Sequence, residues 1–207
     1  MTAQYPTRRE AIFGLAFLVG SLAYNPLGTL DSIAYAGTKS RKTGKKDNSK
    51  KEIRERMKKA NYQDFGRDSE EVLLAKMLFG EARDCSELEN IAIVYTAINR
   101  ANDNVAWNGK TSKEAILEPY QYECFNLGNP NREKLKNPQK YEPKAYEDCL
   151  RIAKDVLSGK YKDPTNGATT YYQPDSISEP ERFKKMQKIG KISTPQGPSK
   201  HVFYRER

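Results

Sequence analysis

Residues 68–83 constrain the fold of this chain more than any other stretch, because their pattern predicts one helix whose apolar stripe ends at a carboxylate. Asp68 suits the N-cap position, and Glu71 completes a capping box three residues later. The apolar side chains that follow recur at helical spacing, and Glu81 falls on their stripe just after Gly80, which lets other groups come close. A carboxyl group beside apolar neighbours loses hydration, which favours the protonated form that a general acid needs. Glu81 is therefore a candidate general acid, and a plain helix-end residue turned to water is an equally good interpretation of this stretch alone.

More helices follow, and strands come late. Ser86 and Glu89 form a second capping box before an amphipathic helix that ends near residues 99–100, where the polar side chains either face a site or simply end the helix. Helices are also predicted at 111–117, after a third capping box, and at 145–156, with a polar, Pro-rich surface loop at 129–143 between them. Short β-prone runs are found near the C-terminus, at residues 168–174, 189–192 and 201–204. Helices first and strands late predict an α+β domain with a small antiparallel sheet near its C-terminus.

Residues 119–126 alternate aromatic side chains with amides and show neither helical nor strand periodicity. Sugar sites are commonly built this way, because flat rings stack on the apolar face of a pyranose and amides bond its hydroxyls. A loop anchored by buried rings is the alternative.

The chain divides into three parts. Residues 1–36 contain Arg8-Arg9, an apolar run and a small-x-small site, which predict a signal peptide with a loose twin-arginine character, or an uncleaved anchor. Residues 37–61 form a basic linker, expected to be mobile and helical only near 53–60, and residues 62–207 form the folded domain. Both N-terminal interpretations place the domain outside the cytoplasm, secreted or in the periplasm or cell wall.

Charge is concentrated in the linker. Residues 37–60 carry eleven basic and three acidic side chains, whereas residues 61–207 carry 23 basic and 22 acidic. A near-neutral folded part argues against nucleic-acid binding and leaves a basic arm that meets an anionic envelope polymer.

Cys85, Cys124 and Cys149 have no CxxC spacing and the chain has one histidine, so we predict neither a metal site nor a cofactor. If the protein is exported, one disulfide can form, and the sequence does not say which pair makes it.

Five sequence boxes, taken together and in order, resemble the SleB-like cell wall hydrolases, which include the spore cortex-lytic enzymes. The boxes are residues 73–83 (the E-A-R box), 91–100, 119–125, 167–174, and 189–190 with 201–204. Gln173 stands where that family usually has Asn, the 129–143 loop looks like an insertion, and only the basic linker stands where the spore enzymes often carry a peptidoglycan-binding module.

The resemblance implies a monomeric domain like lysozyme or the lytic transglycosylases that cleaves the glycan strands of peptidoglycan, with Glu81 as its catalytic residue. It also suggests Gln121, Phe125, Tyr171, Tyr172 and His201 as substrate-binding residues, although strand alternation predicts that only one of the two tyrosines faces the site. His201, as a lone histidine, also fits a structural role.

No second carboxylate of comparable placement is evident in the sequence, so a single acid/base that closes a 1,6-anhydro ring is expected. Two alternatives remain: muramidase hydrolysis, and a non-catalytic wall-binding protein on the same fold. The sequence leaves open the host, a role in sporulation, phage lysis or wall remodelling, and whether the signal is cleaved.

Overall fold

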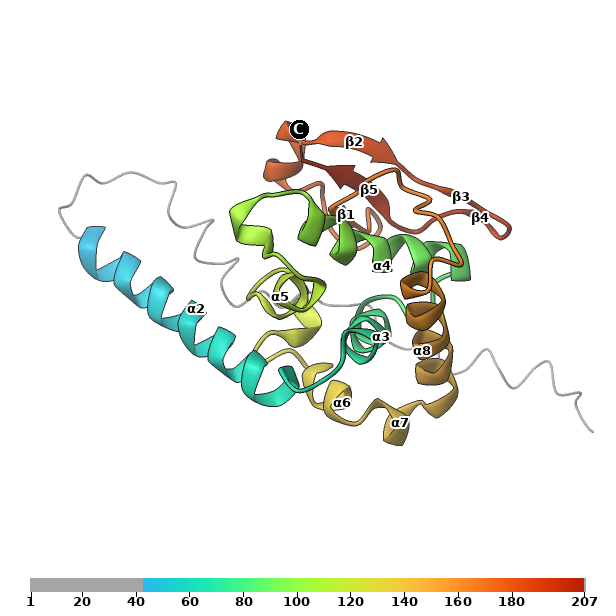
Figure 1. Ribbon diagram of the computed structural model, residues 1–207. Helices are drawn as coiled ribbons and strands as arrows, with labels where there is room; N and C mark the ends of the chain where they lie inside the picture. Colours follow the sequence, from blue (N-terminus) through green and yellow to red (C-terminus); the bar gives the residue numbers. More distant parts are fainter. Residues whose placement is uncertain (1–42, 207) are drawn as a thin grey trace, which may run out of the picture. The chain divides into compact units, whose positions relative to one another are not determined.

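The computed structural model describes residues 43–206. The predicted signal peptide, residues 1–36, and the first residues of the predicted linker lie outside this range. Within it, helices precede a small antiparallel sheet at the C-terminus, which confirms the α+β prediction (Figure 1). None of the helices in this range is long and apolar enough to cross a membrane.

Helix α2, Thr43–Phe65, occupies most of the predicted linker. Met57, Asn61 and Phe65 recur every four residues and are buried, so the end of the helix packs on the domain. The Asn61 amide donates to the carbonyl of Leu117 at 2.9 Å. The predicted boundary between residues 61 and 62 therefore falls inside a continuous helix, and the helix is longer than the short segment expected at 53–60.

Helix α3, Glu70–Glu81, is the central helix of the domain. Every residue from 73 to 79 is buried, and α3 packs against α8, α5 and α4 (Figure 1). A helix that is apolar on all sides is stable only when it is surrounded in this way. Its N-cap is Ser69, whose hydroxyl accepts from the Val72 N–H at 3.3 Å. Asp68, the predicted cap, instead pairs with Lys76 at 2.7 Å.

Helix α4, Glu87–Asn102, starts at Ser86, whose hydroxyl accepts from the Glu89 N–H, as predicted. Helix α5, Ser112–Leu117, starts at Thr111 in the same way. The 3-10 turns η1, Ala106–Asn108, and η2, Glu123–Phe125, lie before and after α5.

The 129–143 segment is not the loop that was predicted. It contains two short helices, α6 at Arg132–Lys136 and α7 at Pro138–Tyr141. Arg132 is buried and bonds to Asn61 at 2.6 Å, to Asp64 at 2.9 Å and to the carbonyl of Phe125. These polar contacts hold the segment in place. They leave no apolar periodicity in the sequence from which the two helices could be predicted.

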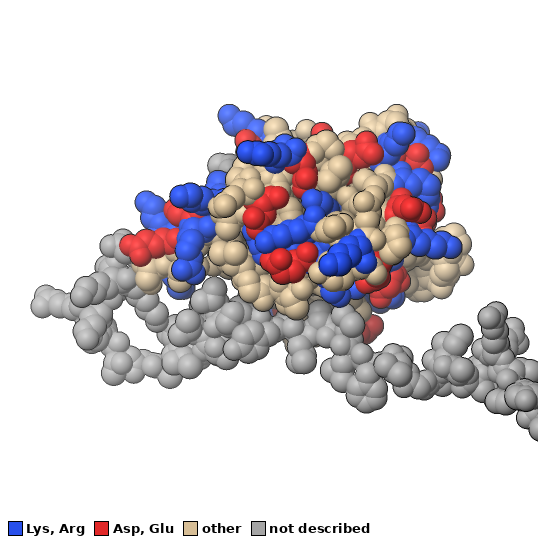
Figure 2. Space-filling model, turned by 90° about the horizontal axis from the view of Figure 1, so that it is seen from below, with Lys and Arg blue, Asp and Glu red and all other residues tan. Residues whose placement is uncertain are grey.

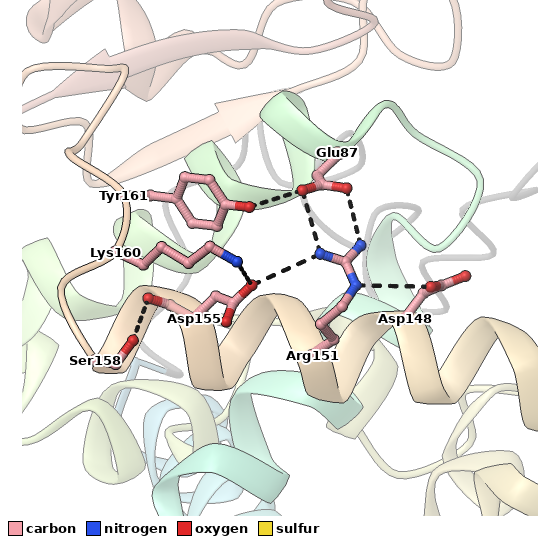
Figure 3. Close-up of polar contacts among 7 residues, drawn as sticks. All are labelled: Glu87, Asp148, Arg151, Asp155, Ser158, Lys160 and Tyr161. Atoms are coloured by element: carbon pink, nitrogen blue, oxygen red, sulfur yellow. Dashed lines mark hydrogen bonds and ion pairs between the residues drawn. The ribbon is translucent and has the colours of Figure 1, made fainter.

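Helix α8, Pro143–Leu157, packs extensively on α3 and also joins α4 through a charged network (Figure 3). Arg151 of α8 donates two hydrogen bonds to the carboxylate of Glu87 in the first turn of α4, at 2.8 and 3.2 Å. The Tyr161 hydroxyl donates to the same carboxylate at 2.9 Å. These bonds hold the pKa of Glu87 below its ordinary value, with Arg151 as the largest cause.

The sheet has the order β1-β5-β2, with β1 at Thr170–Tyr172, β5 at Val202–Arg205 and β2 at Gln187–Gly190, all antiparallel. A separate two-stranded pair joins β3, Ser193–Thr194, to β4, Gly197–Pro198. The 3-10 helix η3, Glu181–Lys185, adds Phe183 to a small second core beneath the sheet.

Candidate active site

Glu81 is the last residue of α3, and its side chain is half-buried. One carboxylate oxygen, Oε1, accepts from the backbone N–H of Cys124 at 3.1 Å. The helix therefore delivers the carboxylate, and the η2 turn holds it in one orientation. An acid that is fixed but still reaches solvent suits proton transfer to a bound ligand.

Gly80 makes this contact possible. A Cβ at position 80 would lie 2.6 Å from the Cβ of Cys124 and 2.7 Å from its Sγ, closer than atoms can pack. The absence of a side chain at Gly80 thus lets η2 approach the end of α3, as the sequence suggested. The Cys124 thiol is buried, and burial together with the charge of Glu81 raises its pKa well above the ordinary value, so it remains a neutral thiol.

Two phenols lie within the electrostatic reach of Glu81. Burial is the main cause of the raised pKa of both Tyr122 and Tyr171, and the charge of Glu81 raises both further. The Tyr122 hydroxyl bonds to Thr96 Oγ1 at 3.2 Å. The Tyr171 hydroxyl is buried and has no hydrogen-bond partner among residues 43–206. A buried hydroxyl without a partner costs free energy, so the Tyr171 hydroxyl is an unsatisfied donor in this part of the fold.

Arg100, near the end of α4, contacts residues on both sides of the site. Its guanidinium lies 4.7 Å from the ring centre of Tyr122 and donates to the carbonyl of Thr169 at 2.5 Å and to that of Gln121 at 3.4 Å. The sequence left open whether the polar end of this helix faces a site. The structure shows that Arg100 bonds to one predicted site residue, Gln121, and to Thr169, two residues before another, Tyr171.

Glu123 is a second carboxylate that the sequence analysis missed. Although the residue as a whole is exposed, lost hydration and then the charge of Glu81 raise the pKa of Glu123. Glu123 precedes Cys124 in η2, and the Cys124 N–H holds Glu81, so both carboxylates belong to the surroundings of the same turn. Only the position of Glu123 between Tyr122 and Cys124 could have suggested it.

A cavity of about 370 Å³ is lined by Gln121, by Thr170 and by Arg100, which also contacts the ring of Tyr122. Glu81 and Tyr171 are not among its lining residues, and strand alternation places Thr170 on the opposite face of β1 from Tyr171. The polar wall of the cavity includes Arg100, Arg182 and Lys185. Trp107 also lines it and is 60% exposed, which leaves an indole face open for stacking on a sugar. The sequence analysis did not single out Trp107, the one tryptophan of the chain.

The predicted substrate-binding residues separate in the structure. Gln121 lines the cavity, and Tyr171 is on the Glu81 side of the sheet. Tyr172 packs on Phe183 in the second core, so the predicted alternation of the two tyrosines is confirmed.

Two of the predicted substrate-binding residues, Phe125 and His201, are buried. Phe125 is fully buried, with its ring edge against Phe65, so we assign it to the core and not to a ligand site. His201 is 6% exposed, and its ring contacts Glu89 at 2.8 Å.

The sequence matches the model of the Cell Wall Hydrolase family over residues 86–204, more than half of the chain. The chain therefore belongs to the cell wall hydrolase family, as its sequence boxes predicted. Because the match begins at residue 86, the role of Glu81 rests on its own geometry.

Two solved structures are similar to this chain. One is the catalytic domain of the germination-specific lytic transglycosylase SleB from Bacillus anthracis, with 22% identity, 68% of this chain and 98% of that chain covered, and a TM-score of 0.47. The other is the catalytic domain of the Bacillus cereus SleB protein, with 23% identity, 66% and 89% coverage, and a TM-score of 0.46. A comparison with curated proteins found no match.

Proposed function

We propose that this cell wall hydrolase cleaves peptidoglycan glycan strands between N-acetylmuramic acid and N-acetylglucosamine, and that Glu81 is its acid and base. The observation that carries the proposal is the half-buried Glu81 carboxylate, which the Cys124 N–H holds at 3.1 Å. The unpartnered hydroxyl of Tyr171 lies within the electrostatic reach of this carboxylate.

In the proposed reaction, protonated Glu81 donates its proton to the glycosidic oxygen as the bond to C1 of the muramic acid breaks. The resulting carboxylate then removes the proton from the C6 hydroxyl of the same sugar, and O6 bonds to C1 to close a 1,6-anhydro ring. Glu81 ends protonated, as it began, and no water is consumed. Tyr171 donates a hydrogen bond to the sugar, and Gln121 and Trp107 contact neighbouring units.

Muramidase hydrolysis is the second candidate, and Glu123 is the observation that favours it. Glycosidases that use water commonly need two carboxyl groups, and the pKa of Glu123 responds to the charge of Glu81. In this scheme Glu81 is the acid and Glu123 activates the water.

The remaining proposals concern the setting of the enzyme. We propose that it acts as a monomer outside the cytoplasm and that exposed residues of α2 hold it to an anionic envelope polymer. Figure 2 shows a face of the molecule on which basic and acidic side chains are interspersed. Such a mixture favours local ion pairs over binding to a long nucleic acid.

Mass spectrometry of the fragments released from purified peptidoglycan tests the proposal. We expect products that end in 1,6-anhydro-muramic acid, lost in Glu81→Gln and kept in Glu70→Gln, an exposed glutamate on the same helix. Reducing muramic ends that require both Glu81 and Glu123 would replace the transglycosylase with a muramidase. Sedimentation with the wall but no release would make the protein a binding protein.

A further inference from the structure

Three side chains of metal-binding type converge at the start of α4. Cys85 precedes α4, Glu89 lies in its first turn, and His201 precedes β5. One ligand atom from each, the thiol sulfur, a carboxylate oxygen and a ring nitrogen, lies within 4.8 Å of the others. Among residues 43–206, this is the one group of three such side chains that could hold a metal ion.

The group is already held in place by the fold. Glu89 is 2% exposed, and its Oε1 accepts from the His201 backbone N–H at 2.8 Å while the His201 ring lies at the same distance. The His201 ring also packs edge-on against Tyr171, with ring centres 5.0 Å apart. Cys85 is half-buried, so one side of the group reaches solvent.

The chemistry of the three ligand atoms favours one kind of metal ion. A thiolate, an imidazole and a carboxylate suit Zn²⁺, which takes sulfur, nitrogen and oxygen ligands in tetrahedral sites. We propose that Cys85, Glu89 and His201 bind one Zn²⁺ ion and that a water molecule completes its coordination. Glu81 is not one of the three ligands, the sequence analysis predicted no metal site, and the family match assigns none.

Charge fits this proposal, whereas protonation of the thiol opposes metal binding. Burial and the neighbouring Glu89 raise the pKa of the Cys85 thiol to about 12, so without metal the thiol keeps its proton. Binding releases that proton, and the two charges of the ion balance the thiolate and the carboxylate. The nearest ammonium, on Lys200, is paired with Asp84 at 3.3 Å, which limits its repulsion of a cation.

The site would join the start of α4 to the strand that leads into the sheet. Glu89 and His201 are 112 residues apart, and a shared ion would add a cross-link between them. Because the ion binds only the folded chain, saturating zinc should raise the thermal midpoint of unfolding.

The experiment uses the full chain, stripped of metal under reducing conditions and titrated with Co²⁺, a spectroscopic substitute for Zn²⁺. We expect a thiolate-to-cobalt absorption band that saturates at one ion per chain and disappears when Zn²⁺ is added. Cys85→Ser should abolish the band, and Cys149→Ser, a change to a cysteine in α8, should keep it. Circular dichroism establishes that each variant is folded.

Glu89→Gln provides a second test, because the amide oxygen can still accept from the His201 N–H and so preserve the fold. We expect it to weaken Zn²⁺ binding by more than about tenfold, since even outer-shell partners account for about 10- to 100-fold. The proposal is overturned if wild-type protein gives no thiolate band, if the band persists in Cys85→Ser, or if Glu89→Gln binds Zn²⁺ like wild type.

Discussion

The Cys124 backbone N–H donates to Oε1 of Glu81 at 3.1 Å, which joins residues 43 positions apart in the sequence. The bond uses a main-chain donor, so it fixes the carboxylate whatever side chain stands at position 124. It also ties the acid to the η2 turn, and Gln121, two residues before that turn, lines the cavity.

Replacement of Glu81 with glutamine is expected to remove activity and leave the fold intact. The amide oxygen still accepts from Cys124, but the side chain no longer carries an exchangeable acidic proton. General acid–base catalysis contributes about 10²- to 10⁴-fold, so fragment release should fall by at least this factor. The rate of release by Glu70→Gln serves as the control, and full activity in folded Glu81→Gln would disprove the proposed role.

Gly80→Ala is expected to destabilise the protein and lower activity together. The new methyl group would meet Cys124 at 2.6 Å, and overpacking of this kind costs about 1–3 kcal/mol. Urea unfolding measures the loss. The double variant Gly80→Ala/Cys124→Gly removes both close contacts, so the two changes should be strongly non-additive; simple additivity would show that they do not meet.

Tyr171→Phe should separate function from stability. The hydroxyl has no partner in the described part of the protein, so its removal should leave the free energy of unfolding equal or higher, by up to about 3 kcal/mol. If the hydroxyl binds the sugar in the transition state, activity should fall about tenfold or more. Tyr172→Phe, on the opposite face of β1, is the matched control. Unchanged activity in Tyr171→Phe would exclude the phenol from substrate binding.

The sequence predicted the parts of the fold that depend on local signals. The caps at Ser86 and Thr111 lie where their hydroxyl groups meet the first free N–H groups of α4 and α5. The short helices α6 and α7 escaped prediction because their order comes from tertiary bonds of Arg132 with α2 and η2, which leave no periodic pattern.

The candidate site was predictable only in part. Glu81 stands out because helix periodicity places it. The influence of its charge on Glu123 and Tyr171 depends on tertiary packing, which leaves no local pattern in the sequence. Phe125 was misassigned for the same reason, since an aromatic residue in a loop gives no sign of which way its ring points. Cys85, Glu89 and His201 likewise share no recognisable spacing.

Acid should loosen the attachment of α2 to the domain. Glu118 pairs with Arg54 at 2.6 Å and with Lys58 at 2.8 Å, both on α2. Burial raises the pKa of Glu118, but the bonds from Lys58 and Arg54 outweigh it and hold that pKa below its ordinary value of 4.5. A lowered pKa in the folded state means that the stabilisation is complete above about pH 4.5 and is lost as the pH falls through the lower, folded value.

Because Arg54 and Lys58 are partly exposed, the effect should not exceed about 1 kcal/mol. The protection factors of amide hydrogen exchange along the second half of α2, compared at neutral and acid pH, measure this loss of stability. In Glu118→Gln, the protection factors of α2 should be lower than in wild type at neutral pH, and they should fall less on acidification. If acid lowers the protection factors of α2 equally in both proteins, other carboxylates control the attachment of the helix.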